Sequence, residues 1–257
     1  MPILLGFLAL FWSLPQAAAA CQGLSQGFQA SVARVIDAET LRLHDGAQLR
    51  LAGILAPHQH DAGAVPHAWA GAIAARAEVE ALVLGKTISV SFGAERRDRY
   101  GRHLGHVFVG EAEPRWLQGH LLGQGLVRVV TRARDTACEA EMLALEKPAR
   151  EARIGLWKDA AYAVRAATDI DALTAAAGHF VVVEGAVTAA RRAGASLRLE
   201  FAEKGRFGLV GLVPRLKGKR PHDLTPGKRV RLRGWIEERG GRPTLDLAVI
   251  GNLEPLD

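Results

Sequence analysis

The first twenty residues, MPILLGFLALFWSLPQAAAA, contain no charged side chain. An apolar core from Ile3 to Leu14 is followed there by Pro15 and an alanine tract. This order indicates a secretory signal, although the positive residues that usually begin one are missing. The core is shorter than the ~20 residues that a membrane-spanning helix needs, and no later segment is long and apolar enough to span. We therefore expect residues 1–20 to be a signal peptide and the mature chain to be exported, either to a periplasm or to the medium.

Cysteine is scarce, because Cys21 and Cys138 are the only two in 257 residues. The chain can therefore form at most one internal disulfide, and an oxidising compartment favours it. A bridge across a loop of this length stabilises a fold by up to ~4.7 kcal/mol on the chain-entropy model. The alternative is a lipoprotein with Cys21 as its lipidated first residue. Such sequences usually carry Leu three positions earlier, where this chain has Ala18.

Acidic residues are outnumbered in the last third of the chain. From Phe180 onward, 15 Lys and Arg residues stand against 9 Asp and Glu, a net charge of +6. The whole chain also carries +6, so the residues before Phe180 sum to zero. A cationic excess confined to one segment indicates a polyanion partner there. An ordinary solvated basic surface explains the charge equally well.

The first half of the chain alternates between strand and helix patterns. Residues 29–56 alternate apolar and polar positions around an Asp-Gly turn, which predicts a β-meander. Residues 65–86 predict a helix. Two strands, a helix and a short strand follow, and residues 138–157 predict a last helix, interrupted or kinked near Pro148.

The second half predicts a different organisation. Residues 161–178 are Ala-rich and weakly patterned, and we interpret them as a linker after a first domain of residues 21–160. Residues 179–257 predict five short strands separated by Gly-rich or basic turns. So many short strands in so few residues suggest a small barrel or an open sandwich. The expected fold class is α+β, mainly β.

Several arginines of the first domain suit a phosphate. The segment RDRYGR places Arg97, Arg99 and Arg102 around a tight turn at Tyr100, and Arg50 ends an earlier strand. Two guanidiniums that converge on one site can hold phosphate oxygens and stabilise charge that develops in phosphoryl transfer. Each signal is weak alone, because an Arg-rich hairpin is most often a solvated surface.

Taken together, the segments VIDAETLRL, LRLAGILAP, DRYGR, LLGQGLVRVV and ARIGLW follow one another as in the thermonuclease family, whose fold is that of staphylococcal nuclease. The resemblance covers residues 30–158. It implies a five-stranded OB-type barrel with three helices, here followed by a small second β-barrel that is OB-like. Active members of the family hydrolyse DNA and RNA with Ca²⁺, using two aspartates, a threonine carbonyl, a glutamate general base and two arginines.

The resemblance carries over only in part. It places Arg50 and Arg102 on the two arginine positions, where they would clamp a phosphate, and Glu39 on the first aspartate ligand. The second aspartate falls on Leu55, and the carbonyl ligand falls on Ala56, whose backbone could still serve. Ca²⁺ takes about 6–8 oxygen ligands. The resemblance therefore leaves Ca²⁺ possible, at a site that lacks a carboxylate at Leu55.

The base and stacking positions also differ. The general base falls on His58, and the two tyrosines that flank the substrate base fall near Thr131 and Ala133, so stacking there is lost. An imidazole titrates near pH ~6.5 and can act as a base without a metal, which suits RNA cleavage by the internal 2′-hydroxyl. The alternative is a transition-metal site, whose candidate ligands are His58, His60, His67 and Asp61. His103 and His106 are expected to be packing or surface residues.

In the second domain, the segment GKRVRLRGWIEERGGRPTLDL is similar to OB-like modules that follow some exported thermonuclease-like proteins. The alternation of side chains along a strand puts Val230 and Leu232 on one face. The other face then carries Arg229, Arg231, Arg233 and Trp235. Arginines followed by an aromatic suit a surface that tracks a nucleic-acid backbone and stacks on bases. The alternative is an edge strand protected by charge.

Three hypotheses follow. The chain is an exported nuclease-like phosphodiesterase that acts on DNA or RNA with altered metal use, or an inactive fold that binds nucleic acid or an envelope polyanion. The third is a structural envelope protein whose arginines serve only ion pairs. Arg50 and Arg102 favour the first two over the third, and Leu55 favours the second over the first. Fold alone does not decide among them, because function resides in the site.

Overall fold

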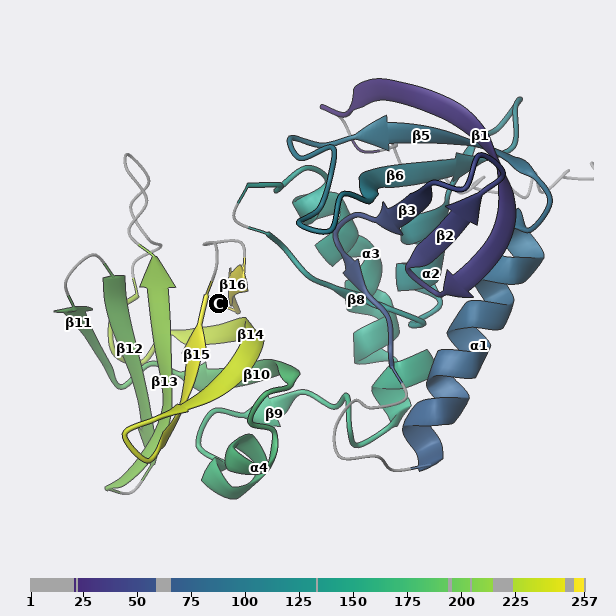
Figure 1. The fold of residues 1–257 in the computed structure, drawn as a ribbon. Coiled ribbons are helices and arrows are strands. Elements are labelled where there is room, and N and C mark those ends of the chain that lie inside the picture. Colours follow the sequence, from purple (N-terminus) through teal and green to yellow (C-terminus); the bar gives the residue numbers. More distant parts are fainter. Residues whose placement is uncertain are drawn as a thin grey trace, which may run out of the picture.

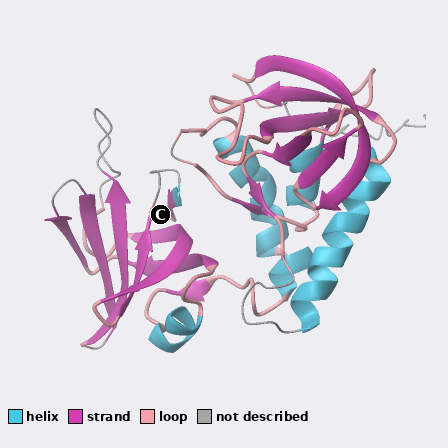
Figure 2. Ribbon diagram, in the orientation of Figure 1, coloured by secondary structure: helices cyan, strands magenta, loops and turns pink. Residues whose placement is uncertain are grey.

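Two β-barrels lie side by side in the computed structural model, and helices gather beneath the first of them (Figures 1 and 2). The structure describes residues 21, 23–58, 66–132, 134–193, 196–203, 205–214, 224–247 and 252–256. The predicted signal peptide lies outside these residues. Within them, no helix is both long enough and apolar enough to cross a membrane.

Five strands close the first barrel. They are β1 (Ser25–Asp37), β2 (Thr40–Leu43), β3 (Gln48–Leu51), β5 (Thr87–Phe92) and β6 (His103–Val109). β1 pairs with both β2 and β5, and β3 runs parallel to β6, so the order β1-β2-β3-β6-β5 returns to β1. Apolar residues at alternate positions, such as Leu41, Leu43, Leu49 and Leu51, point inward and are fully buried. The predicted five-stranded OB-type barrel is confirmed.

The three expected helices accompany this barrel. They are α1 (Pro66–Val83), α2 (Leu117–Gly123) and α3 (Glu139–Glu151). The predicted last helix is shorter than expected, because the chain leaves α3 three residues after Pro148 and re-forms only as the 3₁₀ turn η1 (Gly155–Lys158). Two short strands, β4 (Ile54–Leu55) and β8 (Arg128–Val129), pair with each other, and β7 (Arg115–Trp116) pairs antiparallel with the end of β6.

Cys21 and Cys138 form the predicted disulfide, with their Cα atoms 5.0 Å apart. Both cysteines are buried, and the bridge ties the start of the described chain to the first turn of α3. Lipidation of Cys21 would use the same sulfur atom, so this bridge is incompatible with the lipoprotein alternative.

The second barrel follows the same strand order. Its strands are β10 (Phe180–Ala186), β11 (Ala189–Ala193), β12 (Ser196–Glu203), β13 (Arg206–Pro214), β14 (Arg229–Arg239) and β15 (Arg242–Asp246). The consecutive segments β10 and β11 act as one bent first strand, because β11 pairs with β12 while β10 pairs with β14. β13 runs parallel to β15, as β3 does to β6. The sheet therefore closes as an OB-like barrel, and β16 (Leu253–Pro255) adds to β14.

The predicted linker is wrong, because residues 161–178 belong to the second barrel. They form β9 (Arg165–Ala166), which pairs with β10, and α4 (Ile170–Ala175). Leu173 is fully buried in the core of that barrel, and the Asp169 carboxylate caps α4 by accepting the Ala172 N–H at 3.1 Å. The segment appeared weakly patterned because two of its four buried residues, Ala167 and Ala176, are alanines.

Candidate nucleic-acid interface

The loop before β6 is built around one carboxylate. Asp98 accepts the backbone N–H groups of Tyr100 and Arg102, at 2.9 and 3.0 Å, and the Arg102 Nε at 2.7 Å. Burial opposes ionisation of Asp98, but the hydrogen bonds from Arg102 and the backbone outweigh it, so the pKa of this carboxyl lies below its usual value. Asp98 thereby holds Arg102 in a fixed position at the turn.

Tyr100 stands out from this turn. It is 68% exposed, and the guanidiniums of Arg99 and Arg102 lie over its ring at 4.8 and 5.3 Å from the centroid. The turn predicted from RDRYGR therefore presents an aromatic ring and several cations on one surface.

Glu39 is the partner of Arg50, the other predicted clamp arginine. Because Thr40 pairs with Arg50 in the β2–β3 hairpin, the Arg50 side chain reaches the Glu39 carboxylate, and its Nη1 is 2.6 Å from Oε1. The same oxygen lies 2.9 Å from His58 Nε2, while Oε2 accepts the Ala56 N–H at 3.1 Å. Glu39 is fully buried and both of its oxygens are engaged.

These residues do not fit the calcium site that the resemblance implies. The carboxylate of Glu39 is already paired with the Arg50 guanidinium and hydrogen-bonded to His58 and to the Ala56 N–H, and Leu55 offers no oxygen from its side chain. A buried carboxylate whose charge is balanced by a guanidinium has little charge left to attract a metal cation. In the part of the chain that the structure describes, no three His, Cys, Asp or Glu side chains form a group that could hold a metal.

The alternative transition-metal site falls mostly outside the described residues, because His60, Asp61 and the side chain of His67 are not among them. Ala133 lies outside them too. The other two histidines serve packing: His103 lies against the rings of Phe28 and Phe92, and His106 is buried beside Trp116.

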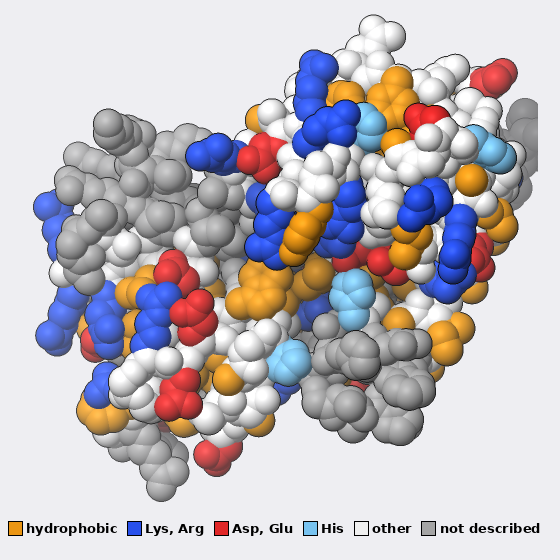
Figure 3. Space-filling model, viewed as in Figure 1, with side chains coloured by type: hydrophobic (Ala, Val, Ile, Leu, Met, Phe, Trp, Pro, Cys, Tyr) orange, Lys and Arg blue, Asp and Glu red, His pale blue; other side chains and the backbone are white. Residues whose placement is uncertain are grey.

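Arg50 and Arg102 line a common cleft of ≈940 Å³ at the junction of the two barrels. Lys and Arg side chains gather there, with hydrophobic side chains among and beside them (Figure 3). The described residues that line the cleft include the arginines Arg50, Arg97, Arg99, Arg102, Arg132 and Arg134, the acids Glu95 and Asp98, and Thr131, Tyr100 and Trp235. The cleft therefore unites both predicted clamp arginines and all three predicted residues of the turn.

Arg132 and Arg134 were missed from the sequence. They follow β8 in a turn where Asp135 accepts the Ala94 N–H at 3.2 Å, which ties this turn to the end of β5. Burial raises the pKa of Asp135. The signal for this pair is the TRARD segment, in which two arginines one residue apart closely follow a buried strand.

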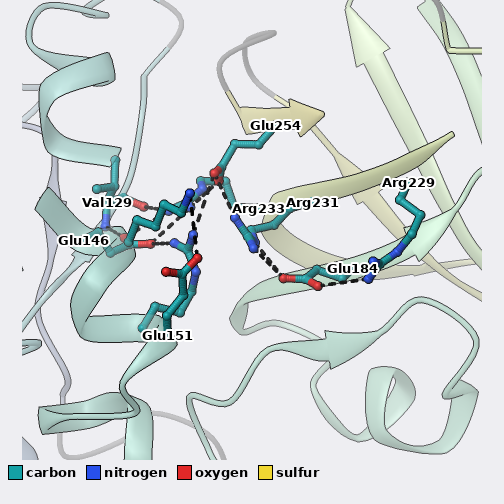
Figure 4. A network of polar contacts seen from close by, with 10 residues as sticks. Val129, Glu146, Glu151, Glu184, Arg229, Arg231, Arg233 and Glu254 are labelled. Atoms are coloured by element: carbon teal, nitrogen blue, oxygen red, sulfur yellow. Dashed lines mark hydrogen bonds and ion pairs between the residues drawn. The ribbon is translucent and has the colours of Figure 1, made fainter. Parts of the chain in front are cut away.

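The predicted arginine surface of β14 is wrong for Arg231 and Arg233. Arg233 is 0% exposed, and its guanidinium binds Glu146 of α3 at 3.1 Å, Glu254 at 2.5 Å and the Val129 carbonyl at 3.3 Å (Figure 4). Arg231 pairs with Glu184 and Glu254, at 2.7 and 3.0 Å. The four residues do alternate along the strand, but Arg231 pairs with carboxylates of β10 and β16, and Arg233 packs on α3.

Burial opposes the charge of Arg233, but Glu146 and Glu254 outweigh it, so the pKa of its guanidinium lies above the usual value. Arg229 is mostly exposed and lies 3.7 Å from Glu184. Trp235 is 48% exposed and faces the cleft, not the arginines of its own strand.

The comparisons with known proteins agree with this geometry. The model of the staphylococcal nuclease homologue family matches residues 48–159, which run from β3 through η1. Protein ParB of Escherichia coli is 31% identical over 137 residues, which cover 50% of this chain and 71% of ParB. Residues 48–159 contain three of the five barrel strands, the three helices and the six arginines of the cleft. On this match and this fold, the chain belongs to the staphylococcal nuclease homologue family.

Proposed function

We propose that this protein is exported and binds nucleic acid in the arginine cleft, without Ca²⁺-dependent hydrolysis. One observation carries the proposal: six arginines of the described chain line one cleft with only two acids, and Arg102 already neutralises one of these. Phosphodiesters are the common biological polyanion that such a cleft suits. The disulfide supports export, because such bridges persist in oxidising compartments.

The state of Glu39 separates this proposal from a calcium nuclease. A calcium ligand needs free lone pairs on its carboxylate, and those of Glu39 face Arg50, His58 and the Ala56 N–H. Arg50 is therefore partly engaged by the buried carboxylate of Glu39. It lines the cleft, but the other arginines must supply most of the charge that binds a phosphate.

Binding is tested with a fluorescein-labelled oligonucleotide and a salt series. Arg99→Ala and Arg134→Ala each remove one cation from the cleft, so each should weaken binding and reduce the log–log salt slope by about 0.7 for a single strand. The matched control is Arg191→Ala, which removes an exposed arginine of β11 outside the cleft. An equal loss in all three variants, or no binding by the natural chain at low salt, would contradict the proposal.

A second candidate is metal-independent RNA cleavage, which the contact between Glu39 and His58 favours. A buried carboxylate orients the imidazole beside Arg50, and this arrangement suits a general base next to a phosphate. The base would take the proton of the 2′-hydroxyl, whose oxygen attacks phosphorus. The 5′-oxygen leaves and takes a proton from water, and a 2′,3′-cyclic phosphate results.

This candidate predicts cleavage of RNA, but not of DNA, at the same rate with EDTA as with Ca²⁺. His58→Ala should lower that rate roughly 10²–10⁴-fold, the usual contribution of a positioned base. His44→Ala, an exposed histidine on the same barrel, is the control. The products are separated on a denaturing gel. Intact RNA after long incubation rejects cleavage and leaves the binding proposal standing, whereas stimulation by Ca²⁺ overturns our account of Glu39.

A further inference from the structure

Trp235 belongs to the second barrel but lines the cleft of the first. It lies on β14 and shares the cleft with Arg50, Arg102 and Thr131. About half of its surface, 48%, is exposed. The open part of this ring lies among the arginines of the cleft, so a ligand that binds there can also bury apolar surface against the indole.

The position of Trp235 is fixed relative to the first barrel. Two residues earlier on the strand, Arg233 is bound to Glu146 and to the Val129 carbonyl. The strand partner of Trp235 is Phe180, whose carbonyl accepts Arg128 Nη1 at 2.8 Å. The Phe180 ring also meets the indole edge-on, with centroids 4.9 Å apart and planes at 73°. These contacts join β14 and β10 to β8 and α3, so the indole is preorganised at the cleft.

The other exposed ring in the cleft is differently placed. Tyr100 has the guanidiniums of Arg99 and Arg102 over it. The indole of Trp235 therefore offers an apolar face to a ligand, while the arginines around it offer charge. A ligand that matches both features has a phosphate backbone and flat aromatic bases. These bases must be unpaired, so that they can stack on the indole instead of on one another.

We propose that the second barrel completes the cleft, and that Trp235 stacks on unpaired bases of single-stranded nucleic acid while the arginines contact its phosphates. This inference rests on the proposed function. Both domains then contribute to the binding site. The first barrel supplies the arginines, and the second supplies Trp235, the aromatic surface on which bases stack, which we call the base platform. This arrangement also predicts selectivity for single strands, since the bases of a duplex are paired and already stacked.

The experiment compares three ligands of equal length on the full chain: a single-stranded DNA, the same strand with abasic sites, and its duplex. The natural chain should bind the single strand more tightly than the abasic strand, which keeps the phosphates but lacks the bases. It should also bind the single strand more tightly than the duplex. Equal affinity for all three overturns the base platform, and affinity for none overturns the proposed function with it.

Variants then locate the platform. Trp235→Leu should weaken binding of the single strand about 5- to 100-fold, leave the salt slope unchanged and leave the abasic strand unaffected. Trp235→Phe keeps a ring and should retain most of the affinity, which guards against a folding defect in the Leu variant. Phe207→Leu is the matched control, because Phe207 is an exposed aromatic of the second barrel that does not line the cleft. If Trp235→Leu binds like the natural chain while Arg99→Ala binds more weakly, the platform is wrong and the arginine cleft stands.

Discussion

His106 makes the stability of the fold depend on pH. Its imidazole is buried in β6, and its Nδ1 has no hydrogen-bond partner among the described residues. Burial lowers the pKa of His106 to about 4, whereas an unfolded histidine titrates near ~6.5. The unfolded chain therefore takes up this proton first as pH falls. Stability from the neutral imidazole is complete above pH ~6.5 and is lost progressively toward pH ~4.

We expect the free energy of unfolding to fall by about 2 kcal/mol between pH 7.5 and pH 5 on account of His106 alone. His106→Phe removes the titrating group and keeps an aromatic ring beside Trp116, so its stability should change less over this range. Urea unfolding at both pH values measures the difference, with His44→Phe on the exposed surface as the control. An identical pH dependence in His106→Phe and the natural chain would show that folding does not lower the pKa of His106.

At the scale of elements, β14 is buried on both faces along its first half. Val230 and Leu232 fill the second barrel, while Arg231 and Arg233 meet carboxylates of β10, β16 and α3. The arginines thus hold two elements from different barrels together. Removing one partner of a buried ion pair leaves an uncompensated charge, which costs more than the pair itself contributes.

Arg233→Met should therefore lower the free energy of unfolding by about 3 kcal/mol, because Glu146 and Glu254 lose their shared cation, although Arg150 and Arg231 still pair with them. Urea unfolding measures the change, and differing midpoints for the two barrels would show that they have uncoupled. Arg239→Met, at the exposed end of the same strand, should have little effect although it also breaks ion pairs. Comparable losses in the two variants would mean that the buried network is not what joins the barrels.

At the scale of the whole molecule, α3 connects the parts. Its first turn is tied to Cys21 by the disulfide, and its middle carries Glu146, which binds Arg233 of the second barrel. The two barrels repeat one strand order, yet they contribute differently to the cleft: the first supplies its cations and the second its tryptophan. The cleft exists because α3 and β8 hold the barrels in one arrangement.

The sequence by itself determined the elements that depend on local pattern. Alternating apolar positions predicted the strands of both barrels, and the two cysteines predicted the bridge that the structure contains. The resemblance selected Arg50 and Arg102 from short sequence segments, and both line the cleft with Tyr100, while their role toward a phosphate stays a prediction. Alternation also grouped Arg231, Arg233 and Trp235 on one face of β14 correctly.

Only the tertiary structure decided what covers each face. A strand's two faces are equivalent until something packs on them, so the pattern could not show that α3 buries Arg233 while leaving Trp235 open to the cleft. It also could not show that Arg50 pairs with Glu39 and that His58 is hydrogen-bonded to it, since these residues meet through a hairpin and a loop. The linker was misjudged for the same reason, because small alanines reveal their burial only through their neighbours. Charge pairing and burial depend on distances between distant segments, which are properties of the folded chain alone.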